Sequence, residues 1–392
     1  MKKILMIATV PSMIGQFNMN NISILLNMGY EVHVACDWTN RSVWSDEKVT
    51  DLKNRLEELK IKYYQIDYSR SMFDLKKHII SYKQTVQLLK NNEYEFIHCH
   101  TPIASAIARY ACKKMDTKCI YTAHGFHFFK GAPKINWLLF YPIEKLCSYW
   151  TDILITINRE DYQRAKKSFH AKKIEYVPGV GIDLKKFQTG LIDVEKKRKE
   201  LGLGDTETML LSVGELSTRK NHEVVIKALG KLQNKKMLEN VHYFICGKGE
   251  LLTKLKLLVH ELELDSVVKF LGFRQDISEL CQAADLFIFP SLQEGLPVAL
   301  MEAIACKTPV ICSKIRGNED LINCKDDMFQ ALDVESVFIN IKEKCVDETG
   351  EIRRALVMEK MENNVDANYR ILQRFSLSFV DKRMHQIYQD IM

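Results

Sequence analysis

The chain has 392 residues, of which 46% are hydrophobic and 27% are charged, and its formal net charge at pH 7 is +6. Its length exceeds what one hydrophobic core usually serves, so two domains are expected. No apolar segment approaches the ~20 residues that span a bilayer. The eleven cysteines form no CxxC pair, which favours reduced thiols in a cytoplasmic protein over a disulfide framework.

Short apolar runs alternate with helical patterns along the whole chain, which predicts two doubly wound parallel sheets. The opening MKKILMIATV is followed by Pro11 and a polar stretch without a small-residue cleavage pattern, so we expect a buried strand and not an export signal. Further strands are expected at EVHVAC, EFIHCH, KCIYTAH, DILITIN and IEYVPG, and then at TMLLSVG, VHYFICG, VVKFLGF, DLFIFP and TPVICS. Ligands of such folds bind beyond the carboxyl ends of the strands, so the site is expected in the cleft between the two sheets.

Charge is divided unevenly. Residues 1–190 hold 28 Lys and Arg against 18 Asp and Glu, a net of +10, whereas residues 191–392 hold 28 against 32, a net of −4. A basic first half favours an anionic partner such as a lipid headgroup, a pyrophosphate-linked acceptor or a membrane surface. A solvated lysine-rich surface is the alternative. Nucleic acid is not expected as a partner, because the basic residues are dispersed and no nucleic-acid-binding module is recognised.

Histidines follow or end two strands of the first half. His98 and His100 flank Cys99, but alternation along a strand points Cys99 away from both, so these three residues are not interpreted as a metal site. His124 follows the next strand, and Gly125 lets the backbone turn there. The segment from 127 to 150 mixes aromatic, basic and apolar residues. It fits either an amphipathic helix at a membrane surface or an ordinary packed helix.

A basic pair follows the strand TMLLSVG. The next segment, GELSTRKN, places Arg219 and Lys220 at a loop-to-helix junction. A guanidinium binds two phosphate oxygens at once, and an ammonium adds a point charge beside them, so the pair can neutralise a diphosphate. Alone, such a pair would be interpreted as an exposed basic turn; beside the glutamates described next, phosphate binding is the better interpretation.

The most informative segment is FPSLQEGLPVALME, which places Glu294 and Glu302 eight positions apart. Pro297 suits the first turn of a helix, so Glu294 is expected on a loop, with Glu302 roughly 10–12 Å further along. Two carboxylates at this spacing can bind hydroxyls at two points of one extended ligand, and the helix start offers free N–H groups to an anion. A nucleotide sugar has hydroxyls at both ends and a diphosphate between them.

These segments resemble those of the retaining glycosyltransferases of family 4, which have the GT-B fold. The family's E-x7-E motif matches Glu294 and Glu302, and its diphosphate-binding pair matches Arg219 and Lys220. The opening ATVPSMIGQFNMNNISILLNMGYEVHVAC and the closing RFSLSFVDKRMHQIYQDIM also resemble this family. The segments HCHTPIASAIARYACKK and YTAHGFHFFKG resemble members that build bacterial capsules and exopolysaccharides.

The resemblance implies two Rossmann-like domains whose parallel sheets face a central cleft. Residues 1–185 would bind the acceptor, residues 186–370 would bind the nucleotide sugar, and a helix within residues 371–392 would cross back to the first domain. It also implies retaining transfer of a sugar from a UDP-sugar to an undecaprenyl-pyrophosphate-linked saccharide in exopolysaccharide or capsule synthesis. No cofactor and no metal are expected, because the basic pair and a helix N-terminus supply the positive charge.

The resemblance also assigns roles to single residues. Glu294 would hold the donor sugar, Glu302 the ribose, and His124 the sugar from the opposite domain. Other expected donor contacts are Gly214, Phe273, Arg274, Gly295 and Leu296; expected contacts of the first domain are Gly15 and His127. The segment VPSMIGQFN is expected to be a loop that faces the cleft, and it departs from the family pattern at Gly15, where many relatives have two glycines. The chain also departs from the pattern after Ile322, where a shortened sheet edge is expected.

Two other functions remain open at this point. One is a different enzyme on the GT-B fold, such as a nucleotide-sugar epimerase or a sucrose- or starch-type synthase. The other is a non-catalytic partner subunit that keeps the fold. The protein is expected in the cytoplasm, with weak association with the inner leaflet of the plasma membrane.

Overall fold

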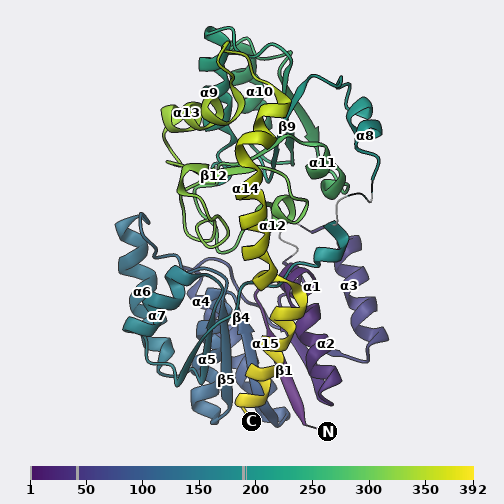
Figure 1. Ribbon diagram of the computed structural model, residues 1–392. Helices are drawn as coiled ribbons and strands as arrows, with labels where there is room; N and C mark the ends of the chain where they lie inside the picture. The colour runs from purple at the N-terminus through teal and green to yellow at the C-terminus, as the bar shows by residue number, and fades with distance from the viewer. Residues whose placement is uncertain (1, 41–43, 188–189, 191) are drawn as a thin grey trace. The chain divides into compact units, whose positions relative to one another are not determined.

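The computed structural model describes residues 2–40, 44–187, 190 and 192–392, which form two compact units (Figure 1). The first unit comprises Met1–Gly181 and Ser378–Met392, and the second comprises Ile182–Leu377. Of the two limits proposed from the sequence, residue 185 lies in the 3-10 helix η1 (Leu184–Phe187) and residue 370 lies inside helix α14 (Arg354–Leu372). Among the described residues, no helix combines the length and the apolar character that crossing a membrane requires.

The first unit contains a sheet of seven parallel strands in the order β3-β2-β1-β4-β5-β6-β7. The strands are β1 (Lys3–Ile7), β2 (Glu31–Cys36), β3 (Lys62–Gln65), β4 (Tyr94–His100), β5 (Lys118–Ala123), β6 (Ile153–Thr156) and β7 (Lys173–Tyr176). The helices are α1 (Pro11–Phe17), α2 (Met19–Asn27), α3 (Asp46–Glu58), α4 (Leu75–Asn91), α5 (Pro102–Met115), α6 (Lys134–Ser148), α7 (Arg159–Ser168) and α15 (Leu377–Asp390).

The central strand β1 contributes to two apolar cores, one on each face of the sheet. Ile4 and Met6 belong to one core, and Leu5 and Ile7 belong to the other. Because side chains alternate along a strand, a strand that is covered on both faces must be apolar at every position. This is why uninterrupted apolar runs were the correct signal for these strands.

The closing helix α15 packs on the first unit, as the resemblance implied. Its residues Val380, Met384, Ile387 and Tyr388 are buried in the same core as Ile4 of β1. Helix α14, which precedes it, belongs to the second unit. The chain therefore returns to its first unit at the end, as the GT-B fold requires.

The second unit contains a sheet of six parallel strands in the order β10-β9-β8-β11-β12-β13. The strands are β8 (Thr208–Val213), β9 (Val241–Cys246), β10 (Val268–Gly272), β11 (Leu286–Phe289), β12 (Val310–Ser313) and β13 (Met328–Phe329). The remaining helices are α8 (Val194–Glu200), α9 (His222–Asn234), α10 (Leu252–Glu261), α11 (Ile277–Ala283), α12 (Val298–Ala305) and α13 (Val334–Cys345), with 3-10 turns η2 (Lys325–Asp327) and η3 (Gln373–Phe375).

Two edge strands, β3 and β13, were not predicted from the sequence. The residues of β3 are polar or half-exposed, so they form no apolar run. Strand β13 has only two residues, which pair with Cys312 and Ser313 of β12. The edge after Ile322 is therefore short but still carries a strand, and Phe329 of that strand is buried in the core.

Candidate functional site

Three residues singled out from the sequence meet in the second unit, where β8 and β11 end. Nζ of Lys220 lies 2.6 Å from Oε1 of Glu294, and Nη1 of Arg219 lies 3.1 Å from the same oxygen. Lys220 is 74 positions from Glu294 in the sequence. They come together because β8 and β11 are hydrogen-bonded neighbours, and parallel strands end at the same edge of a sheet.

The cluster carries a net positive charge, because two cations share one carboxylate. The side chains of Lys220 and Glu294 are 13% and 9% exposed, whereas Arg219 is 45% exposed. Ser291 donates a further hydrogen bond of 2.8 Å to Glu294. The ammonium of Lys220 is partly desolvated, and this burial lowers its pKa. A desolvated ammonium beside an accessible guanidinium is suited to binding a diphosphate.

Arg316 contacts the main chain of this cluster and was not singled out from the sequence. It is 5% exposed, and its Nε donates a 3.2 Å hydrogen bond to the main-chain carbonyl of Glu294. The next residue, Gly317, has φ +82°, and a Cβ there would lie 2.8 Å from the carbonyl oxygen of Gly295. The loop after β12 therefore packs against the turn that carries Glu294. The sequence signal that could have identified Arg316 was an Arg-Gly pair soon after a predicted strand.

Glu302 lies on α12, which begins at Val298 with Pro297 as its N-cap. The proline thus precedes the helix by one position, close to where it was expected. Burial raises the pKa of Glu302 to about 7. Near neutral pH this carboxyl group can donate or accept a hydrogen bond, which suits an interaction with a hydroxyl group.

The glycines of this region allow close approach of main-chain segments. Gly247 has φ +155°, and a Cβ there would lie 1.8 Å from the carbonyl oxygen of Gly214. A Cβ on Gly249 would lie 2.3 Å from the carbonyl oxygen of Leu216. The turn formed by residues 247–250, GKGE, therefore packs closely against the loop that carries Arg219 and Lys220. At Gly214 itself, a Cβ would lie 3.2 Å from Cδ of Lys220.

Phe273 and Arg274 follow β10 and differ in their surroundings. The side chain of Phe273 is 61% exposed. Arg274 forms an ion pair with Asp276, with Nε 2.8 Å from Oδ1, and holds the pKa of that carboxyl well below its usual range. Lys197 also contacts Asp276 at 3.0 Å. The guanidinium of Arg274 is thus held in place by the protein, and its expected contact with a nucleotide base stays a prediction.

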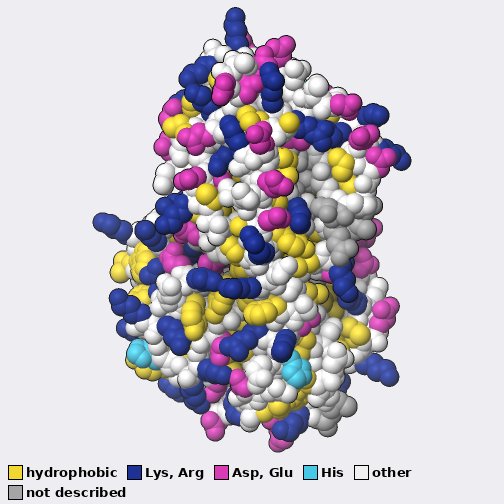
Figure 2. Space-filling view, in the orientation of Figure 1, with side chains coloured by type: hydrophobic (Ala, Val, Ile, Leu, Met, Phe, Trp, Pro, Cys, Tyr) yellow, Lys and Arg dark blue, Asp and Glu magenta, His cyan; other side chains and the backbone are white. Residues whose placement is uncertain are grey.

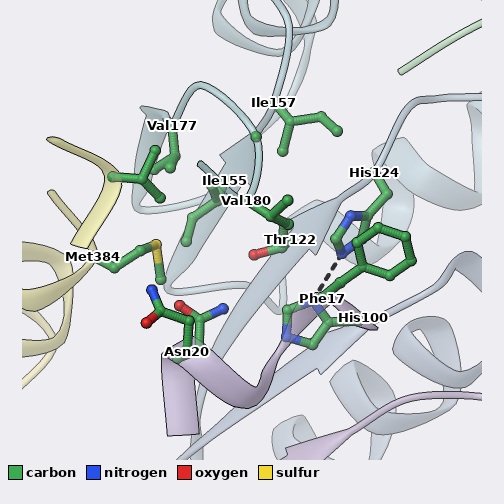
Figure 3. Close-up of a pocket in the computed structure, with 13 residues that line it drawn as sticks. Phe17, Asn20, His100, Thr122, His124, Ile155, Ile157, Val177, Val180 and Met384 are labelled. Atoms are coloured by element: carbon green, nitrogen blue, oxygen red, sulfur yellow. Dashed lines mark hydrogen bonds between the residues drawn. The ribbon is translucent and has the colours of Figure 1, made fainter. Parts of the chain in front are cut away.

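In the first unit, His124 lies directly after β5 and contacts two aromatic residues (Figure 3). Its Nε2 is 3.0 Å from Nδ1 of His100, and its ring centre is 6.1 Å from that of Phe17. Burial lowers the pKa of His124 to about 4, so the imidazole is neutral at pH 7. Cys99 points to the opposite face of β4, where its sulfur lies 3.7 Å from that of Cys119. The predicted alternation of this strand is confirmed.

Gly15 and His127 occupy positions determined by packing. The segment around Gly15 was expected to be a loop, but it is helix α1, which starts at Pro11. A Cβ on Gly15 would lie 2.3 Å from the ring of Trp44, so this helix packs closely on that side chain. The ring of His127 stacks on Phe140 of α6 at 4.5 Å. The expected role of both residues toward an acceptor stays a prediction.

Helix α6 has one apolar face in the core and another in solvent. Trp137, Phe140 and Tyr141 pack against the core of the first unit. Ile135, Leu138, Ile143, Leu146 and Tyr149 are 44% to 71% exposed and, at 100° per residue, share one side of the helix. Figure 2 shows hydrophobic and basic side chains together on the left edge, where Figure 1 labels α6.

The chain matches two family models. Residues 3–158 match the model described as glycosyl transferase 4-like, and residues 193–329 match the one described as glycosyl transferases group 1. The chain is 34% identical over 333 residues to a putative glycosyltransferase, EpsD, of Bacillus subtilis, which covers 84% of this chain and 83% of that protein. It is 31% identical over 281 residues to the UDP-Gal:alpha-D-GlcNAc-diphosphoundecaprenol alpha-1,3-galactosyltransferase of Escherichia coli, covering 70% and 71%.

Solved structures resemble the chain over its whole length. Anabaena Alr3699/HepE, crystallised with UDP and glucose, has a TM-score of 0.73 at 19% identity, and the likeness covers 100% of both chains. WaaG, a glycosyltransferase involved in lipopolysaccharide biosynthesis, has a TM-score of 0.69 at 16% identity, covering 98% of this chain and 99% of that one. At these identities the likeness shows the fold, which is GT-B.

Proposed function

The chain belongs to the group 1, GT4-like glycosyltransferases, and we propose that it transfers a sugar from a UDP-sugar to an undecaprenyl-diphosphate-linked saccharide with retention of configuration. The observation that carries this proposal is the convergence of Arg219 and Lys220 on Glu294. One edge of the second sheet thus presents both positive charge for a diphosphate and a carboxylate for sugar hydroxyls.

The leaving group explains why positive charge is needed here. When the bond between the sugar and the diphosphate breaks, negative charge grows on the β-phosphate. Preorganised cations in a site of low dielectric stabilise that charge more than water does. Lys220 supplies a partly desolvated ammonium and Arg219 an accessible guanidinium, which supports our proposal that this step uses no metal ion. The departing phosphate would then help to deprotonate the acceptor hydroxyl on the same face.

The two glutamates are assigned to the two ends of the donor. Glu294 lies beside the cationic pair and would accept hydrogen bonds from hydroxyls of the transferred sugar. Glu302, on α12, would contact the ribose, and its raised pKa lets it donate or accept there. The choice of UDP is supported by the Escherichia coli relative, whose name specifies UDP-Gal as its donor.

The lipid-linked acceptor is supported by that same relative, whose named acceptor is a diphosphoundecaprenol-linked GlcNAc. The exposed apolar face of α6 supports a bilayer as the place of reaction. Lys134, the first residue of α6, and Lys130, four positions before it, are both exposed. Each lysine near an anionic surface contributes about 1 kcal/mol, so a few suffice for weak, reversible binding. We therefore place the protein on the cytoplasmic face of the plasma membrane, in synthesis of a bacterial surface polysaccharide.

A panel of UDP-sugars and a lipid-diphosphate acceptor bearing one GlcNAc tests the proposed function. We expect one UDP-sugar to raise the melting temperature, to hydrolyse slowly alone, and to transfer its sugar to the acceptor with the α-anomeric configuration. A β-linked product would refute retention. Conversion of a UDP-sugar to its epimer or to free sugar and UDP without transfer would instead favour an epimerase. Binding of no nucleotide sugar would favour a non-catalytic partner subunit.

A further inference from the structure

A small cavity lies beside His124 in the first unit (Figure 3). Its volume is about 20 Å³. Its lining includes apolar side chains such as Ile155, Val180 and Met384, and the polar side chains of Asn20, Asn21 and Thr122. His100 also lines it, is 1% exposed, and has a buried Nε2 without a hydrogen-bond partner among the described residues.

The hydrogen bond between the two histidines requires a definite arrangement of protons. Burial lowers the pKa of both imidazoles, so both are neutral at pH 7. A neutral imidazole has one N–H and one lone pair, so one ring donates to the other across the 3.0 Å from Nδ1 of His100 to Nε2 of His124. Two arrangements are possible, and they differ in what they leave inside the cavity.

Nε2 of His100, which has no partner among the described residues, discriminates between these two arrangements of protons. If Nδ1 of His100 accepted, its proton would sit on Nε2, as a buried N–H without an acceptor among the described residues. If Nδ1 donates, Nε2 carries only a lone pair. Orphaned buried N–H groups are rarer in proteins than under-satisfied acceptors. The second arrangement is therefore favoured, and it leaves the proton of His124 on Nδ1, which bonds no other described residue.

We propose that His100 is a positioning residue that donates its Nδ1–H to Nε2 of His124, and so holds His124 in the tautomer that offers Nδ1–H to an oxygen of the bound substrate. The identity of His124 as a substrate contact rests on the proposed function. The ring of His100 is itself held by that of His98, whose centre is 4.2 Å away. His98 in turn bonds Oη of Tyr388 at 2.9 Å and Oγ1 of Thr122 at 2.8 Å.

The tautomer can be observed directly, whether or not the enzyme is active. Full-length protein labelled with ¹⁵N-histidine would be studied by long-range ¹H–¹⁵N correlation at pH 7, with His124→Gln used to assign the His124 signals. We expect protonated Nδ1 and unprotonated Nε2 for His124. In His100→Phe we expect a mixture of tautomers. Protonated Nε2 in the unmodified protein, or no change in His100→Phe, would overturn the proposal.

Three substitutions of His100 separate positioning from structural support. His100→Asn places an amide near the position of Nδ1, and His100→Gln places one near the position of Nε2. His100→Phe keeps a ring without nitrogen. We expect the glutamine and phenylalanine variants to lower kcat about tenfold, the value of one hydrogen bond, with UDP affinity changed less than twofold. We expect His100→Asn to retain most of the kcat that the other two variants lose.

Equal losses in the asparagine and glutamine variants, or losses that follow the melting temperature, would show that His100 is only structural. Unchanged kcat in all three variants would also overturn the proposal. If the unmodified protein transfers no sugar from any donor, the proposed function fails, and the tautomer measurement alone decides the relation between the two histidines.

Discussion

Replacing Lys220 with methionine tests the diphosphate site most sharply, because the change removes the charge and keeps the length of the side chain. Nζ of Lys220 is 2.6 Å from Glu294, and its side chain is only 13% exposed. After the change, Glu294 keeps one cationic partner, Arg219, which is 45% exposed. The charge of the cluster falls from +1 to zero, since two cations and one carboxylate become one of each.

The expected loss in rate is large and the expected loss in stability is small. Removing one preorganised group that stabilises developing charge lowers kcat by about 10²-fold or more, which corresponds to ~3 kcal/mol or more of transition-state stabilisation. Stability should fall by only about 1–2 kcal/mol, because Glu294 keeps Arg219 and Ser291 as partners. Removing an ammonium whose pKa burial already lowers offsets part of the lost ion pair.

Lys227 provides a matched control on helix α9, the helix that follows Lys220. It is 45% exposed and forms a 2.6 Å ion pair with Glu223, so Lys227→Met removes a similar contact at the surface. Transfer rates, UDP affinity by calorimetry and melting temperatures would be measured for both variants and for the Lys220→Met, Glu294→Gln double variant. We expect the Lys227 variant to match the unmodified protein, and the two changes in the double variant to be non-additive.

Near-normal transfer and UDP affinity in Lys220→Met would falsify the assignment of this residue to the diphosphate. A loss of activity that appears only where the variant has begun to unfold would also contradict it, since stability and not charge would then be responsible. Additive effects of Lys220→Met and Glu294→Gln would show that the two side chains act separately, despite the distance between them.

Four further predictions follow from particular residues or from the proposed chemistry. Burial raises the pKa of Glu302 from 4.5 to about 7, so folding stability should fall as pH rises through that window. Between pH 5 and pH 8, the free energy of unfolding of Glu302→Gln should rise by about 1–3 kcal/mol relative to that of the unmodified protein, as measured by denaturant titration. Parallel pH profiles of the two proteins would contradict this. Transfer should persist in excess EDTA, and loss restored by manganese or magnesium would overturn the metal-free step. Leu138→Glu should weaken sedimentation with anionic vesicles, whereas Leu257→Glu, at a 59% exposed position of the second unit, should not; equal effects would remove α6 as the binding face. Gly247→Ala should lower stability by about 2 kcal/mol or more, since its Cβ would meet main chain, whereas Gly202→Ala, with open space around it, should cost less; equal melting temperatures would contradict the packing argument.

Local sequence patterns were sufficient to predict most of the fold and the meeting of Arg219, Lys220 and Glu294. Buried parallel strands need apolar residues on both faces, so runs such as KILMI identified them without any knowledge of partners. Arg219, Lys220 and Glu294 each follow such a run, and parallel strands bring their carboxyl ends to one edge. Their convergence was therefore predictable. Helix α1 was missed because its seven residues were interpreted as the loop after the first strand, and β3 and β13 were missed because edge strands need no apolar run.

Other features depend on contacts between segments that are far apart in the chain, and no local pattern encodes them. Arg316 donates a hydrogen bond to the main chain of Glu294 because the loop after β12 packs beside the loop after β11. His100 bonds His124 because β4 and β5 are neighbours in register. Tyr388 reaches His98 across 290 positions, because the last helix packs on the first sheet. Sequence alone determined which residues carry charge and where the buried strands end; tertiary structure decided the partners, because burial and hydrogen bonding depend on what the folded chain places beside each group.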